Sequence, residues 1–174
     1  AESLCFYGLE PKKYIFIREV STSTFNYSKQ EYGKVLDIIN DLPKEYKVLF
    51  SLEDKSKRHL YPAEWIILEE PVNDIHSLIY YSKLLISSGD SMAREGSALG
   101  IPGIYIGVRK MYANAVLMQL ADFYCFDGDN FKTFISDIIQ NTSFERQEHI
   151  RNILDSEFID INIFIEKITK KLIK

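Results

Sequence analysis

The residues best suited to chemistry lie in a small polar turn between an apolar run and a short helical segment, within residues 84–107. The first backbone N–H groups of a helix have no partner inside it, and the helix dipole adds positive potential at that end. A turn of small residues at such a helix start is therefore a natural binding site for a phosphate group. We predict that a phosphate binds at this turn, which consists of Ser88, Gly89, Asp90, Ser91 and Met92.

The same residue types also allow a purely structural explanation of the turn. The side chain of Asp90 or of Ser91 can accept a hydrogen bond from an N–H group of the first helical turn and so cap the helix. The two roles are compatible, because a capping side chain leaves other N–H groups of that turn without a partner. Phosphate binding and simple capping both remain open.

Two apolar runs flank the turn and its helix, at residues 84–87 and 104–106. Each run is typical of a strand that is buried on both faces of a parallel sheet. The helix between them then makes a right-handed crossover between parallel neighbours. The turn is therefore expected at the carboxyl end of a strand, inside a β–α–β unit.

Strand and helix patterns alternate along the rest of the chain. The predicted strands are 14–17, 46–52, 65–68, 84–87, 104–106 and 123–126, and the further predicted helices are 30–40, 73–82, 111–120, 130–140, 142–154 and 160–173. Residues 53–64 are expected to form a charged surface turn. The alternation predicts an α/β fold with a doubly wound parallel sheet of about six strands and helices on both faces.

In the strand order 3-2-1-4-5-6, the first strand (14–17) and the fourth (84–87) are central neighbours whose connections leave toward opposite sides. Ligands of such sheets bind outside the carboxyl ends of these two strands. The loops 18–28 and 88–91 are expected to converge there. A crevice at this point suits a phosphorylated ligand, because loop 18–28 is rich in hydroxyl groups.

Arg18 is the first residue of loop 18–28. Its guanidinium group is suited to bind a phosphate. An ion pair with Glu19 or with Asp90 is an equally open role, because arginine serves in both.

The composition is that of an ordinary globular domain, with 174 residues, 46% hydrophobic and 26% charged, and a net charge of -4. The acidic balance and the scattered basic residues give no footprint for nucleic acid. Cys5 and Cys125 follow no ligand spacing and are expected to be reduced thiols. No run is long and apolar enough to span a membrane, and we expect a cytoplasmic protein.

The segment EPVNDIHSLIYYSKLLISSGDSMAREGSALGIP resembles the nucleotide-binding segment of UDP-N-acetylglucosamine 2-epimerases and related GT-B glycosyltransferases. It is more similar still to a family of unknown function, common in archaea, that is predicted to contain such glycosyltransferases. The marks of the resemblance are Glu70-Pro71, the helix 75–82, the turn 88–92, Glu95 and Leu99-Gly100-Ile101-Pro102. The resemblance extends more weakly over residues 14–128, and it implies a Rossmann-like domain, one half of a GT-B fold.

The resemblance implies roles for three parts of this segment. Glu95 matches the glutamate that grips the ribose hydroxyls of the nucleotide, and a carboxylate suits two adjacent hydroxyl groups. Residues 89–92 match the loop that cradles the diphosphate, and His76 lies where the family contacts the base. For Glu95 by itself, an exposed helix residue or a partner of Arg94 remains open. For His76, a surface or capping residue remains open.

The chain departs from the epimerase pattern at three places. Asp90-Ser91 stands where the epimerases have Gly-Gly, and a carboxylate repels a diphosphate unless it is turned away or offset by a cation. No histidine precedes Arg18-Glu19, and GVRKMYANAV stands where a Thr-Glu-Arg-Pro-Glu stretch is expected. Epimerase chemistry is therefore the weaker inference. No D-x-D motif of the metal-using kind stands out near the turn. The sequence also has no G-x-G-x-x-G motif after a strand and no P-loop motif, so no separate nucleotide cofactor is expected.

These patterns together predict three parts of the chain. Residues 1–13 are expected to connect from a missing N-terminal domain, 14–157 to form a nucleotide-sugar-binding domain, and 158–174 to form a helix that packs on this or the missing domain. The predicted function is the donor-binding half of a GT-B-like glycosyltransferase or related sugar-modifying enzyme, with a UDP-sugar as substrate.

Two further expectations concern activity and partners. The acceptor and the catalytic base belong to the missing domain, so the chain alone is not expected to be active. The apolar face of residues 160–173 docks on the chain's own sheet or on a second copy if no other domain is present. The alternative to the enzyme is a non-catalytic ligand-binding or interaction module that has lost nucleotide binding, and Asp90 is its best support.

Overall fold

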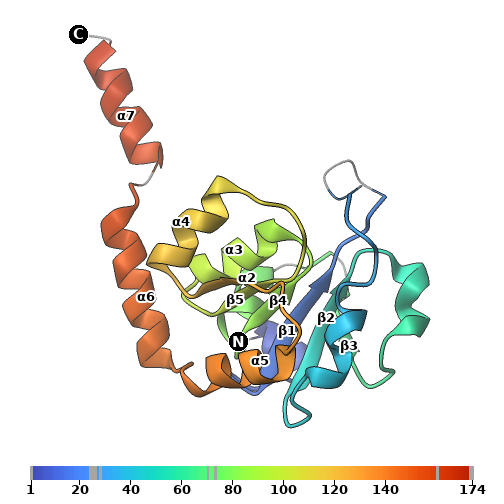
Figure 1. Cartoon of the computed structure of the whole chain (residues 1–174). Helices are drawn as coiled ribbons and strands as arrows, with labels where there is room; N and C mark the ends of the chain where they lie inside the picture. Colours follow the sequence, from blue (N-terminus) through green and yellow to red (C-terminus); the bar gives the residue numbers. More distant parts are fainter. Residues whose placement is uncertain are drawn as a thin grey trace.

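The structure, a computed structural model, describes residues 2–23, 27, 29–69, 71–72, 74–159 and 161–172. Some predicted features lie outside the described residues, namely Glu70, residues 24–26 and 28 of loop 18–28, and the predicted helix ends 73, 160 and 173. The described chain forms a six-stranded sheet with helices around it (Figure 1).

The sheet contains β1 (Tyr14–Glu19), β2 (Lys47–Leu52), β3 (Ile66–Ile67), β4 (Leu85–Ser87), β5 (Gly103–Tyr105) and β6 (Phe123–Cys125). Its order is β3-β2-β1-β4-β5-β6, and all paired strands are parallel. The predicted order is confirmed, with β1 and β4 as central neighbours in which Ile17 pairs with Ile86. Their connections leave in opposite directions, so the switch point lies at their carboxyl ends.

Alternation along the central strands places apolar side chains on both faces of the sheet, as a doubly covered sheet requires. On one face Ile15 and Ile17 pack with Phe131 and Ile135 of α5 (Phe131–Gln140). On the other face, side chains of β1 and β4 pack with α1 (Glu2–Phe6), α2 (Ile75–Tyr80) and α3 (Asp90–Ala98). Helices therefore cover both faces, as predicted.

Among the described residues, the other helices are α4 (Tyr112–Leu120), α6 (Phe144–Glu157), α7 (Ile161–Leu172) and the 3-10 helices η2 (Leu36–Asp41) and η3 (Lys55–Leu60). The prediction of a helix over 30–40 was largely wrong, because only η2 forms there. Gly33 has a φ of +94°, which interrupts a right-handed helix, and the backbone N–H of Val35 donates to the Glu19 carboxylate. The prediction of a plain turn at 53–64 missed η3, which Asp54 begins by accepting a hydrogen bond from the Ser56 N–H.

The two ends of the chain differ in how they meet the sheet. Residues 2–9 pack on the domain, because Leu4 and Leu9 are buried in its core. By contrast, α7 extends away from the body of the domain, and the side chains of Phe164, Ile165 and Ile168 are exposed (Figure 1). None of the helices among the described residues is long and apolar enough to cross a membrane.

Candidate functional site

The predicted phosphate turn lies at the carboxyl end of β4, where α3 begins. Gly89 is the N-cap residue of α3, and no side chain among the described residues caps this helix. The idea that Asp90 or Ser91 is the capping residue was therefore wrong. Gly89 is required by close packing, because a Cβ atom there would lie 2.6 Å from Cγ1 of Val20. The first N–H groups of α3 thus keep the positive potential of a helix start without a capping oxygen.

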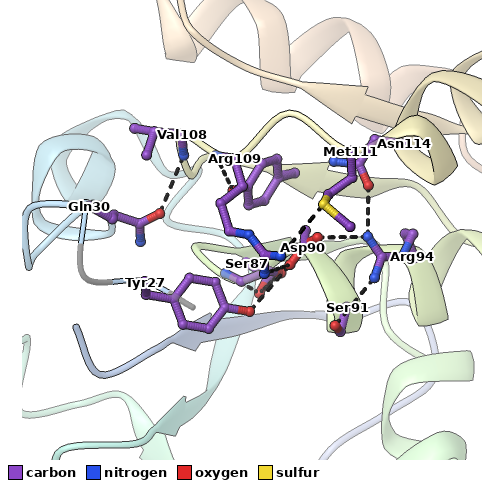
Figure 2. Close-up of polar contacts among 12 residues, drawn as sticks. Tyr27, Gln30, Ser87, Asp90, Ser91, Arg94, Val108, Arg109, Met111 and Asn114 are labelled. Carbon is purple, nitrogen blue, oxygen red and sulfur yellow. Dashed lines mark hydrogen bonds and ion pairs between the residues drawn. The ribbon is translucent and has the colours of Figure 1, made fainter. Parts of the chain in front are cut away.

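Asp90, the first residue of α3, is buried, with 1% of its surface exposed. Its Oδ2 atom lies 2.7 Å from Nη1 of Arg94, and its Oδ1 atom lies 3.3 Å from Nη1 of Arg109. The hydroxyl of Tyr27 also donates to Oδ1, at 3.3 Å. Figure 2 shows these side chains meeting from the helix, from the loop after β5 and from the loop after β1.

The two arginines change the electrostatics that the sequence suggested for Asp90. Burial by itself raises the pKa of the Asp90 carboxyl, but the hydrogen bond and charge of Arg94, together with the charge of Arg109, hold that pKa below its usual value. The carboxyl is therefore ionised at neutral pH. One negative and two positive side chains surround the turn, so the cluster carries a net positive charge and does not repel an anion.

Asn114, near the start of α4, completes this cluster. It is 4% exposed, and its Oδ1 atom accepts a hydrogen bond of 2.9 Å from Arg94. Its Nδ2 atom is buried and has no hydrogen-bond partner among the described residues. Asn114 and Arg109 line a pocket of about 470 Å³ beside the turn. A buried N–H donor without a partner is costly, and a bound group that accepts from it would remove that cost.

Glu95 and His76 come from different helices, and the structure brings them together. Glu95 follows Ser91 by one turn of α3, and its Oε2 atom lies 3.9 Å from Nε2 of His76, which is in α2. The two side chains are 47% and 66% exposed, so both are open to a ligand. Arg94 does not form an ion pair with Glu95, because its guanidinium contacts Asp90, Asn114 and Ser91 instead.

Arg18 points away from the turn. Its Nη1 atom donates to Oγ of Ser51 at 2.9 Å, and its Nη2 atom lies 3.6 Å from the carboxylate of Glu53. An ion pair of Arg18 with Glu19 or Asp90 was therefore the wrong pairing. The backbone carbonyl of Arg18 still holds the turn, since it accepts from the N–H of Ser88.

Ser88 and Met92 have packing contacts that the sequence did not reveal. The Oγ atom of Ser88 is buried and accepts a hydrogen bond from the Val20 N–H at 2.9 Å. Met92 is half-buried against the apolar core. Ser91 is exposed and accepts a hydrogen bond from Arg94 at 3.3 Å. Among the side chains of the turn, that of Ser91 is thus the most open to a ligand.

Glu19, the last residue of β1, is a buried carboxyl at the same edge of the sheet. Its Oε2 atom accepts hydrogen bonds from the Val35 N–H at 2.8 Å and from the Tyr61 hydroxyl at 3.3 Å. Burial raises the pKa of Glu19 above its ordinary value, although these hydrogen bonds act in the opposite direction. The folded chain therefore binds a proton at Glu19 more readily than the unfolded chain does.

We expect the substitution Glu19→Gln to stabilise the chain increasingly as pH rises. A raised pKa makes the carboxyl favourable to folding below its ordinary pKa, and this contribution is lost as pH rises through the raised value. Gln has no charge to desolvate. Melting followed by circular dichroism should show the variant gaining a few degrees on the parent between pH 5 and pH 8, since 1 kcal/mol is worth about 2–4 °C. A difference between variant and parent that does not change with pH would contradict this expectation.

Several solved structures share this fold at low identity. UDP-N-acetylglucosamine 2-epimerase from Rickettsia bellii matches with a TM-score of 0.61 and 18% identity over 90% of this chain and 48% of that one. The Methanocaldococcus jannaschii enzyme in complex with UDP-GlcNAc and UDP matches with a TM-score of 0.56 and 13% identity, over 89% and 48%. The glycosyltransferase VinC in complex with DTDP matches with a TM-score of 0.64 and 11% identity, over 95% and 43%.

These similarities establish the architecture of this chain, which is one half of the GT-B arrangement. The chain spans less than half the length of each of these three structures. Among curated proteins, none matches the sequence. A family model described as a protein of unknown function (DUF354) matches residues 5–168. Since this match covers most of the sequence, the chain belongs to the DUF354 family.

Proposed function

We propose that this chain binds a nucleoside diphosphate sugar and is the donor-binding half of a GT-B-like glycosyltransferase or a related sugar-modifying enzyme. The observation that carries the proposal is the position of Glu95 and His76, one helical turn from an uncapped helix start that two arginines flank. A nucleotide needs a phosphate site and a ribose site at this kind of separation, and α3 provides both on one helix.

The diphosphate is assigned to the start of α3. Its N–H groups and dipole favour an anion, and Ser91 adds an exposed hydroxyl group. Arg94 and Arg109 outweigh the charge of Asp90. In a glycosyl transfer the diphosphate leaves with its bonding electrons, so this positive cluster would stabilise the charge that develops on it.

The nucleoside is assigned to the start of α2, where His76 lies, and to the middle of α3, where Glu95 lies. The Glu95 carboxylate is suited to accept hydrogen bonds from both ribose hydroxyls, and we propose that the exposed ring of His76 beside it stacks on the base. One similar structure, the Methanocaldococcus jannaschii epimerase, contains UDP-GlcNAc and UDP, and another, VinC, contains DTDP, so we propose a pyrimidine base and take UDP as the first ligand to test. Arg18 is a weaker candidate for phosphate contact, because Ser51 and Glu53 hold its guanidinium.

The sugar is assigned to the pocket of about 470 Å³ beyond Arg109. Arg109 lines this pocket, together with apolar groups of Val108, Met111, Ala115 and Met118. Asn114 also lines this pocket, and its buried Nδ2 atom has no hydrogen-bond partner among the described residues.

The acceptor site and the catalytic base are assigned to a further domain, to which residues 1–13 would connect. We propose that residues 158–174 pack on that domain or on a neighbouring copy, because the apolar side chains of Phe164, Ile165 and Ile168 are exposed in this chain. Light scattering separates a monomer from a dimer.

Among the described residues, no group of three or more His, Cys, Asp or Glu side chains is gathered to hold a metal ion.

A second candidate function is a module that has kept the fold and lost nucleotide binding. The observation that favours it is the buried Asp90 at a turn where the epimerases have glycine. The two candidates differ in one measurable property, since only the first binds UDP.

We expect Glu95→Gln to weaken UDP binding by about 10- to 100-fold, the cost of one or two charge-assisted hydrogen bonds to the ribose hydroxyls. Isothermal titration calorimetry with UDP and UDP-N-acetylglucosamine measures the effect directly. Exposed Glu148→Gln on α6 is the matched control and should bind as the parent does. Equal affinity of the two variants for UDP would show that Glu95 does not bind the ligand.

A further inference from the structure

Arg94 and Arg109 share the same carboxylate, but the structure holds them with unequal strength. Arg94 lies on α3, four residues after Asp90, and contacts Asp90 at 2.7 Å, Asn114 at 2.9 Å and Ser91 at 3.3 Å. Two of these contacts are short, and Asp90 and Asn114 are buried. Arg94 is therefore a fixed part of the cluster (Figure 2).

Arg109 lies in the loop between β5 and α4, and only its backbone is firmly held. Its N–H donates to the Tyr105 hydroxyl at 2.8 Å. Its guanidinium has a long contact of 3.3 Å to Oδ1 of Asp90, lies 3.5 Å from the Met111 sulfur, and lies 5.6 Å from the centre of the Tyr27 ring. The side chain is 30% exposed. Moving this guanidinium to another anion therefore breaks one long ion pair to Asp90, one contact to sulfur and one contact with an aromatic ring.

Asp90 is arranged so that it tolerates the departure of Arg109. Its Oδ2 atom keeps the short bond to Arg94, and its Oδ1 atom keeps the Tyr27 hydroxyl at 3.3 Å. The buried carboxylate would therefore still have a counter-charge and a hydrogen bond for each oxygen. Asp90 itself is 1% exposed and cannot offer a contact to a ligand.

We infer that Arg109 is the mobile phosphate-binding residue of the site and that Asp90 is its resting partner, so that an incoming diphosphate takes Arg109 over from Asp90. This inference rests on the proposed function, and it adds two roles to it. Arg109 is a binding residue, and Asp90 is a positioning residue. Asp90 keeps the guanidinium of Arg109 beside the turn, and it competes with the ligand for that guanidinium. The departure from Gly-Gly at this turn then has a use, because it sets how strongly the site binds a diphosphate.

The test is calorimetric titration of the parent chain and four variants with UDP and with inorganic pyrophosphate. We expect Arg109→Gln to weaken both ligands about tenfold, as loss of one charge-assisted contact does. Asp90→Asn removes the competitor and should tighten both about threefold or more, and the double variant Asp90→Asn/Arg109→Gln should show none of this gain. A purely structural Asp90 would instead weaken binding when substituted, with or without Arg109.

Tyr27→Phe keeps the proposal testable if the Asp90→Asn variant does not fold. It removes the hydroxyl that compensates Asp90 when Arg109 leaves, so it should weaken both ligands about threefold while the melting temperature stays near that of the parent. If the parent binds UDP but Arg109→Gln binds equally well, or Asp90→Asn binds more weakly, the exchange is refuted and the proposed function survives. If the parent binds neither UDP nor pyrophosphate, the proposed function itself fails.

Discussion

Arg94→Met is expected to lower the free energy of unfolding by about 2–3 kcal/mol, because it leaves a buried carboxylate with its weaker cation only. Asp90 would keep Arg109 at 3.3 Å and lose Arg94 at 2.7 Å. Asn114 would lose its hydrogen bond to Arg94, so both of its side-chain polar atoms would be without a partner among the described residues. The estimate stays below the full cost of breaking a buried pair, since a quarter of the Arg94 side chain is exposed.

Urea denaturation measures this change, with Lys132→Met, an exposed residue of α5, as the control. The double variant Arg94→Met/Asp90→Asn should recover part of the loss, because it removes the charge that Arg94 compensates. Unfolding free energies of Arg94→Met and Lys132→Met within about 0.5 kcal/mol of each other would show that the cluster does not hold the turn.

Gly103→Ala is expected to destabilise the chain by about 3 kcal/mol, the upper part of the range for overpacked interiors. A Cβ atom at Gly103 would lie 2.2 Å from the carbonyl oxygen of Ala93 and 2.5 Å from Oγ of Ser97. The carbonyl belongs to the backbone of α3 and cannot rotate away, so the helix that carries the candidate site would have to move off β5. Close approach of α3 to β5 thus depends on the absence of a side chain at Gly103.

Gly128→Ala is a matched control for the added methyl group. A Cβ atom there would lie no closer than 3.5 Å to its nearest neighbour, Phe126, so the substitution adds a methyl group without a clash. Thermal melting of the two variants separates packing strain from the general effect of replacing glycine. A melting point of Gly103→Ala as high as that of Gly128→Ala would contradict this account of how α3 meets the sheet.

The architecture follows from sequence patterns because hydrophobic periodicity and crossover handedness leave few topologies open. The six strands, their order and the place of the switch point could all be predicted in this way. The segment before η2 could not, because its path is set by the φ of Gly33 and by a bond between Val35 and the distant Glu19. Nor did any periodic pattern indicate that residues 2–9 pack on the domain through Leu4 and Leu9.

The candidate site divides in the same manner. Resemblance picked out Glu95 and His76, whose proximity the structure shows, and the helix start was visible as a turn of small residues. The pairing of Asp90 with Arg109 and of Arg94 with Asn114 joins residues about a β–α unit apart, and local patterns do not carry such contacts. One signal was present, since Arg109 follows β5 at the sheet edge where ligands bind.

Calorimetric titration of the parent chain with UDP, with uridine as the comparison, tests most directly that the start of α3 binds a diphosphate. Uridine presents the same base and ribose to His76 and Glu95 but brings no charge to the arginine cluster. We predict saturable binding of UDP, with uridine at least about tenfold weaker, as expected when one or more charge-assisted contacts are missing. No heat from UDP at millimolar concentration, or equal affinity for UDP and uridine, would contradict the assignment of the diphosphate to this turn.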